Sequence, residues 1–218
     1  MKSLLKLSFA GAFAVSISFS LPASSQSIAE ILEQSFDRLA GTNSVSFTPV
    51  FSGGILMGCT LEYSAIVRDW GYRQGAFSRV EGSFGFLSSG AVVAPVLKVV
   101  VNDIDMASLS MQPAAPASAS IVSGFDTNAG SSIDASESDT PGSIFIVFAS
   151  DPPTSMFLDA LVNEKIQLRF ARREGGLDVP IDLDLTVAVI SADGTRSHSD
   201  EAVKTMSECL NRLAGAEQ

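Results

Sequence analysis

Apolar and polar residues alternate with a period of two along much of the chain, a pattern typical of half-buried β-strands. In residues 57–68 the alternating apolar positions are Cys59, Leu61, Tyr63, Ala65 and Val67. Residues 177–190 repeat the pattern, with an apolar residue at every odd position up to 189. Further strands are predicted over residues 44–51, 76–88, 91–106, 143–150 and 165–173.

Three segments have the spacing of helices instead. In residues 27–41 the apolar residues Ile28, Ile31, Leu32, Phe36 and Leu39 share one helical face. A short helix is predicted near residues 153–162, because Asp151 can cap its start and Pro152 suits its first turn. A C-terminal helix is predicted from Ser199 to Gly215, with acidic residues in its first turn.

These elements predict a mainly β protein, a two-layer antiparallel β-sandwich with the C-terminal helix packed on the sheet. Short alternating strands separated by Gly, Ser and Pro turns favour this architecture. A strongly curved sheet wrapped on the terminal helix is the alternative. We expect a single domain over residues 26–218 that contains a Ser-, Ala- and Pro-rich loop at about 112–142, with a short strand near residues 118–125.

Residues 1–25 have the three parts of a secretory signal peptide. An apolar stretch from residue 7 to 21 follows a lysine-containing start, and Ala23 and Ser25 precede a cleavage site before Gln26. This stretch is shorter than the roughly 20 residues that span a bilayer, which favours a cleaved signal over a membrane anchor. The rest of the sequence has no second apolar run long enough to span, so no membrane insertion is expected after cleavage. The predicted location is the periplasm, and the extracellular space is the alternative.

The net negative charge of the chain argues against some classes of binding partner. The chain carries 14 basic and 24 acidic residues, and removing Lys2 and Lys6 with the signal changes the net charge from −10 to −12. Binding to nucleic acid or anionic lipid needs clustered Lys and Arg, so the acidic balance argues against both. The expected partner is an envelope protein or a small ligand, and no cofactor is expected.

The two cysteines are predicted to form a disulfide. Cys59 lies on the apolar side of its strand, and Cys209 shares a helical face with apolar residues of the last helix. An exported protein meets an oxidising environment, in which such a pair bonds. The alternatives are a metal ligand or a catalytic thiol. Both need converging partners, and the chain has one histidine, His198.

No catalytic set and no metal site is predicted. The chain lacks the Gly-x-Ser-x-Gly motif of many serine hydrolases, and His198 reads as a loop residue. The carboxylates of Asp178, Asp182 and Asp184 read as the solvated side of a sheet. Two groups of acidic residues could offer oxygen ligands to calcium, but neither has the ligand spacing and glycine of a calcium-binding loop. They are Asp103 with Asp105, and Asp134 with Glu137 and Asp139.

One predicted turn combines aromatic and basic residues. Trp70, Tyr72 and Arg73 follow the strand that contains Cys59. Aromatic residues and arginine often supply the contacts that dominate a protein interface. We therefore regard these three residues as a possible partner or ligand contact. The alternative is that Trp70 folds back over the sheet edge as part of the core.

Residues 156–185, "MFLDALVNEKIQLRFARREGGLDVPIDLDL", resemble the C-terminal part of proteins of the invasion-associated locus B type. The shared pattern is a short helix, a strand, a glycine-containing turn and a second strand. The resemblance implies a small exported β-sandwich protein without established catalysis. In that family a late helix closely follows the second strand, whereas here "TVAVISADGTRSH" intervenes.

These observations predict an exported, periplasmic, non-catalytic binding or structural accessory protein of the cell envelope. Two other classes remain open at this point. One is a secreted hydrolase of an ester or glycan that uses His198 or a carboxylate pair. The other is a calcium-dependent carbohydrate-binding module.

Overall fold

A computed structural model describes residues 27–89, 92–122, 132–138 and 140–215, so the predicted signal segment lies outside the described residues. Its three helices are α1 (Ile28–Leu39), α2 (Pro153–Asn163) and α3 (Glu201–Gly215). None of these described helices is long and apolar enough to cross a membrane. Most other described residues form antiparallel strands, so the prediction of a mainly β fold is confirmed.

The larger sheet has seven strands. They are β1 (Gly41–Ser52), β2 (Ile55–Asp69), β3 (Ala76–Ser89), β4 (Val92–Asp105), β5 (Ser110–Pro113), β7 (Ser132–Glu137) and β8 (Ser143–Phe148). Their order is β1-β2-β3-β4-β8-β7, and β5 pairs with one end of β4. The tight turn between β1 and β2 passes through Gly53 and Gly54, whose positive φ angles glycine adopts without strain.

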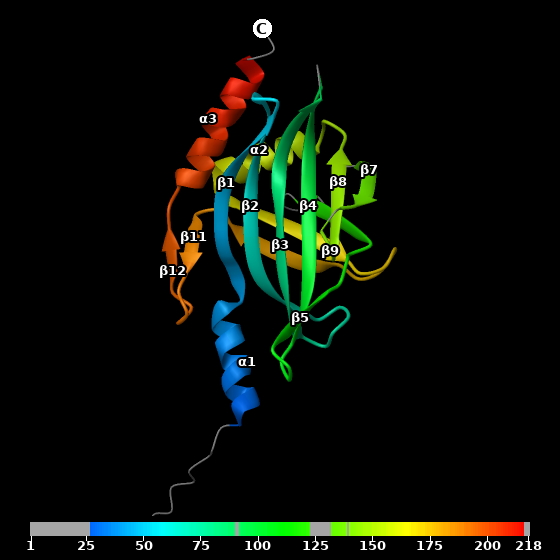
Figure 1. Ribbon diagram of the computed structural model, residues 1–218, viewed down its shortest axis with the longest axis vertical. Helices are drawn as coiled ribbons and strands as arrows, with labels where there is room; N and C mark the ends of the chain where they lie inside the picture. Colours follow the sequence, from blue (N-terminus) through cyan, green and yellow to red (C-terminus); the bar gives the residue numbers. More distant parts are fainter. Residues whose placement is uncertain (1–26, 90–91, 123–131, 139, 216–218) are drawn as a thin grey trace, which may run out of the picture.

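A three-stranded sheet forms the second layer, which gives the sandwich-like arrangement. Its strands are β6 (Ser118–Val122), β9 (Lys165–Ala171) and β10 (Val179–Asp184), in the order β10-β9-β6. In Figure 1 they cross behind the long strands of the larger sheet. Fully buried Leu61 and Leu97 on one layer and Leu168 and Ile181 on the other belong to one apolar cluster. Burying each such side chain contributes about 2 kcal/mol.

A small hairpin lies beside β1 and follows β10 in the chain. It consists of β11 (Val187–Ile190) and β12 (Arg196–His198). Arg196 ties it to the larger sheet, because its guanidinium donates hydrogen bonds to the backbone oxygens of Thr42, at 2.7 Å, and Ala40, at 2.6 Å. The hairpin is therefore held at the start of β1, where α1 ends.

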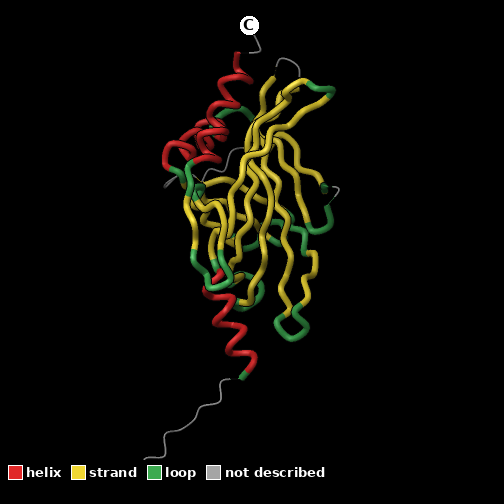
Figure 2. The backbone as a smooth tube through the Cα atoms, turned by 60° about the vertical axis from the view of Figure 1, so that its left-hand side comes forward, coloured by secondary structure: helices red, strands yellow, loops and turns green. Residues whose placement is uncertain are grey.

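The N-terminal and C-terminal helices lie toward opposite ends of the long axis (Figures 1 and 2). Helix α1 starts with a capping box, in which Ser27 and Glu30 each accept the other's backbone N–H. It packs on the outer face of the larger sheet through Phe36, whose ring centroid lies 5.5 Å from that of Phe77. No residue of α1 is fully buried, so this helix is anchored more lightly than α3.

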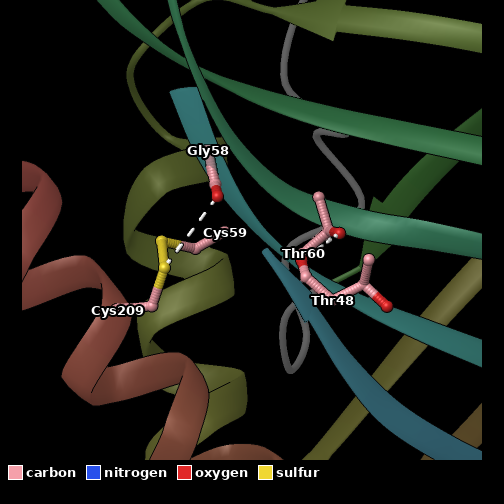
Figure 3. Close-up of a disulfide and its surroundings, with 5 residues drawn as sticks. All are labelled: Thr48, Gly58, Cys59, Thr60 and Cys209. Carbon is pink, nitrogen blue, oxygen red and sulfur yellow. Dashed lines mark hydrogen bonds between the residues drawn. A yellow bond between two sulfur atoms is a disulfide. The ribbon is translucent and has the colours of Figure 1, made fainter. Parts of the chain in front are cut away.

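Helix α3 is pinned to the sheet by the predicted disulfide, which is confirmed. Cys59 and Cys209 are both fully buried, and their Cα atoms lie 6.0 Å apart. Figure 3 shows the bond joining α3 to β2, and beside it the Thr60 hydroxyl donating to the Thr48 carbonyl of β1. The bond therefore joins the last helix to the centre of the core.

The Ser-, Ala- and Pro-rich region differs from the predicted loop. The short strand expected near residues 118–125 is confirmed as β6. However, β7 also lies inside this region, and β5 begins just before it. Strand β5 extends the pairing of β4, while β7 extends that of β8. These sequences lack the apolar alternation of a buried strand because they lie at sheet edges, where backbone pairing does not require two apolar faces.

Candidate functional site

The β2–β3 loop, which carries the predicted contact residues, is built on a buried carboxylate. Asp69 ends β2, and its side chain is fully buried. One carboxylate oxygen accepts the backbone N–H of Tyr72 at 2.8 Å. The Asp69 carbonyl accepts the N–H groups of Arg73 and Gly75. These three bonds determine the path of the loop, so its exposed side chains stand on an ordered backbone.

Arg172, just after β9, is the counter-charge and is half-buried, with 14% of its side chain exposed. Its Nε donates to Asp69 at 2.6 Å, and its Nη atoms donate to both carboxylate oxygens of Asp103 at 2.6 and 3.2 Å. The Ser78 hydroxyl accepts from Arg172 and donates to Asp103. Burial acts to lower the pKa of Arg172, but the hydrogen bonds to Asp103 and Asp69 outweigh it and raise the pKa. We call Asp69, Ser78, Asp103 and Arg172 the buried ionic network.

Arg73 belongs to the support of this loop. Its guanidinium donates to the backbone carbonyl oxygens of Phe77, at 2.5 Å, and Ile104, at 3.2 Å. It also lies 3.4 Å from the Asp103 carboxylate. Because these bonds engage both terminal nitrogens of its guanidinium, Arg73 braces the loop against β3 and β4.

Trp70 forms the outer surface of the loop, whereas Tyr72 is half-buried and packs against the main apolar cluster. Trp70 is 71% exposed. Its indole ring packs closely against Gly75, because a Cβ atom added at Gly75 would lie 2.5 Å from that ring. Tyr72 donates its hydroxyl to the Leu177 carbonyl at 2.7 Å, and the Arg173 guanidinium lies over its ring. Leu177 is itself 63% exposed. We call Trp70, Tyr72, Arg173 and Leu177 the loop platform.

A second feature is a cleft of about 600 Å³ beside α2, which we call the α2 cleft. Its lining includes Thr42, Met156, Asp159, Lys165, Asp182 and Asp184. Helix α2 borders it with Asp159, and the outward positions of β10 border it with Asp182 and Asp184. Cleft and platform lie at opposite ends of β9, because Lys165 begins this strand and Arg172 follows its end.

The carboxylates of the cleft are held in place by the protein. Thr42 is buried, and its hydroxyl accepts the Asp184 N–H at 2.9 Å and donates to the Asp182 carbonyl at 3.3 Å. The Gln167 amide donates to the Asp182 carboxylate at 2.7 Å. Burial acts to raise the pKa of Asp184, but hydrogen bonds from Thr186, with nearby positive charge, outweigh it and lower the pKa.

His198, the centre of the hydrolase alternative, lies exposed on β12. Its Nδ1 is 2.8 Å from the Thr186 hydroxyl, which donates its proton to Asp184. Nδ1 therefore carries the hydrogen in this contact. Among the described residues, no hydrogen bond joins His198 Nε2 to a nucleophile.

The two groups of acidic residues considered as calcium ligands do not form a common site in the described structure. Asp103 is held by Arg172, while Asp105 accepts hydrogen bonds from Ser108 and Ala107, which lower its pKa. Asp134 and Glu137 lie on β7, and Asp139 is outside the described residues. Within the described part of the chain, no three His, Cys, Asp or Glu residues are arranged to hold a metal ion.

The sequence reasoning missed the buried ionic network and the α2 cleft. The ionic network could have been predicted from the alternation of inward and outward positions along the strands. Its four residues occupy inward-facing positions of that alternation: Asp69, Ser78, Asp103 and Arg172. A charged residue at such a position is buried and needs a partner. The cleft left no comparable signal, since Asp182 and Asp184 occupy ordinary outward positions.

No family model matches the chain, and no curated protein and no solved structure matches it either. The resemblance to the invasion-associated locus B type therefore stays a prediction.

Proposed function

We propose that this protein is an exported, periplasmic, non-catalytic binding or accessory protein of the cell envelope, which contacts an envelope protein through the loop platform. The observation that carries the proposal is Trp70, a tryptophan 71% exposed on a loop whose backbone is tied to a buried carboxylate. Rigid aromatic residues lose little conformational entropy on binding and often dominate the energy of an interface.

The surroundings of Trp70 support a protein partner. Leu177 adds exposed apolar surface, and Arg173 adds a guanidinium that can donate hydrogen bonds at its border. The Tyr72 hydroxyl, which donates to Leu177, can still accept one. An apolar centre with a polar border is the usual composition of a protein interface. The buried ionic network holds the two loops that carry these residues in one arrangement, so binding needs little reorganisation.

Replacing Trp70 by alanine tests the contact. We expect Trp70→Ala to reduce recovery of the partner about thirtyfold, the effect of losing a dominant interface residue. The thermal midpoint should change little, because exposed substitutions usually alter stability by less than about 0.5 kcal/mol. The measurement is cross-linking of the tagged protein in intact periplasm of its own host, followed by quantitative mass spectrometry and a melting curve for each variant.

Phe51→Ala is the matched control, because Phe51 is also an exposed aromatic residue, at 60%, but lies near the β1–β2 turn. It should leave recovery unchanged. Equal recovery with Trp70→Ala and the unaltered protein would overturn the platform proposal. A lowered midpoint with intact capture would show instead that Trp70 is part of the folded core.

Export is tested separately. The pattern of residues 1–25 and the disulfide support it, because such bonds persist in oxidising compartments. We expect protein recovered from the periplasm to begin at Gln26 and to lack free thiols. Intact mass before and after thiol alkylation measures both properties. An unprocessed chain confined to the cytoplasm would contradict the proposal.

A further inference from the structure

The α2 cleft combines an apolar floor with charged walls. Met156 and Ala160 from α2 and Leu183 from β10 are nearly buried and line it. Asp159, Asp182 and Asp184 stand on its walls, and Lys165 is the one lysine among its lining residues. The walls therefore carry a net negative charge. A cleft with an apolar floor and a few oriented polar groups is the usual form of a small-ligand site.

The carboxylates do not converge on one point. Asp159 lies on α2, whereas Asp182 and Asp184 lie on β10, and among the described residues they do not form a group suited to a metal ion. Separate carboxylates along an apolar floor fit a ligand whose positive charges are separated by an apolar chain. Of these groups, the Asp159 carboxylate accepts no described hydrogen bond, since Asn163 donates to the Asp159 backbone oxygen, and the Asp182 carboxylate accepts one at a single oxygen. Each therefore keeps acceptor capacity for an ammonium group.

The walls are also pre-organised for such a ligand. Thr42 binds the backbone of both β10 aspartates, and Gln167 orients Asp182. The Asp184 carboxylate is held by the N–H and the hydroxyl of Thr186, which both donate to one of its oxygens. Because the protein already holds these groups in position, little ordering is needed when a cation enters.

We infer that the α2 cleft binds a free aliphatic diamine or polyamine, with methylenes on the apolar floor and ammonium groups on Asp159 and Asp182. Each ammonium donates hydrogen bonds to a carboxylate, which are stronger than bonds between neutral groups. Lys165 disfavours a ligand with a positive charge at that end of the cleft. This site is separate from the loop platform, so either can fail without the other.

Calorimetric titration of the processed protein with 1,5-diaminopentane at low ionic strength tests the site. We expect saturable binding, and Asp159→Asn and Asp182→Asn should each weaken it about tenfold, the effect of losing one charge-assisted hydrogen bond. Pentylamine, with the same chain and one ammonium, should bind about tenfold more weakly. Across diamines of increasing length, affinity should pass through a maximum at the length that spans the two carboxylates.

Asp134→Asn is the matched control, because Asp134 is an exposed aspartate on β7 at the far edge of the larger sheet. It removes the same charge and should leave the affinity unchanged. Equal weakening by all three variants would overturn the inference, since the cation would then respond only to net charge. A flat dependence on chain length, or no binding at all, would also overturn it. If a lysine-rich peptide binds more tightly than every diamine, the inference of a free polyamine is overturned, and the ligand is instead a basic segment of a protein.

Discussion

Replacing Cys59 and Cys209 together by alanine is expected to lower the free energy of unfolding by about 4 kcal/mol. The bond links residues 150 apart in sequence, and the chain-entropy model assigns a loop of this size about 5 kcal/mol, near the upper end of measured values. For a domain of this size the thermal midpoint should fall by about 8–16 °C. Equilibrium denaturation in urea and a melting curve measure the change.

Single substitutions at the same positions provide the control. Cys59→Ala and Cys209→Ala each remove the bond, so each should destabilise the protein nearly as much as the double variant. A reducing agent should shift the midpoint of the unaltered protein toward that of the double variant, and should leave the double variant unchanged. Additive effects of the two single substitutions would contradict this account, because residues that act through one bond are not independent.

Asp69→Asn is expected to lower the free energy of unfolding by about 3 kcal/mol, because it removes the charged acceptor of the Arg172 Nε–H, and Asp103 then remains as the only carboxylate bonded to this guanidinium in the described structure. The Asp69 side chain is fully buried, and its two oxygens accept hydrogen bonds from Arg172 and the Tyr72 N–H. An asparagine can keep only one of these bonds, because its amide nitrogen is a donor that would face the donor of Arg172. The thermal midpoint should fall by about 6–12 °C.

Glu81→Gln is the comparison, since it removes one charge from an ion pair with Arg79 that is more than a third exposed. This change should cost less than about 1 kcal/mol. If Asp69→Asn costs no more than Glu81→Gln, the ionic network does not hold the β2–β3 loop. Hydrogen exchange at Tyr72 and its loop neighbours gives a second measurement, because weakening the bond from the Tyr72 N–H to residue 69 should raise exchange there before global unfolding.

The two proposed sites place different demands on the fold. The loop platform depends on the buried ionic network, because Asp69 and Arg172 lie beneath the two loops that carry Trp70 and Leu177. The α2 cleft depends instead on Thr42, which ties β10 to the start of β1. We therefore expect Asp69→Asn to weaken partner capture while leaving diamine binding intact. This separation makes each proposal testable in the other's absence.

The sequence by itself determined the features that repeat along the chain. The alternation around Cys59 identified β2. The alternation over residues 177–190 predicted one strand, whereas the structure divides it at Leu185 and Thr186 into β10 and β11, which lie in different sheets. The helical spacing before Gly41 identified α1. These predictions succeeded because the period of apolar residues reflects which face of each element is buried. The disulfide followed from the same reasoning, since both cysteines lie on apolar faces in a chain with no other cysteine.

Only the tertiary structure decided which charged groups meet. Arg172 binds Asp69, 103 residues away in sequence, and Asp103, 69 residues away. The sequence predicts Arg73 as a partner or ligand contact, whereas in the structure its guanidinium donates hydrogen bonds to backbone oxygens of β3 and β4. Alternation assigns a residue to a face of one strand. It does not specify which distant strand packs against that face, because this depends on how the two sheets stack and on the register of long-range pairing.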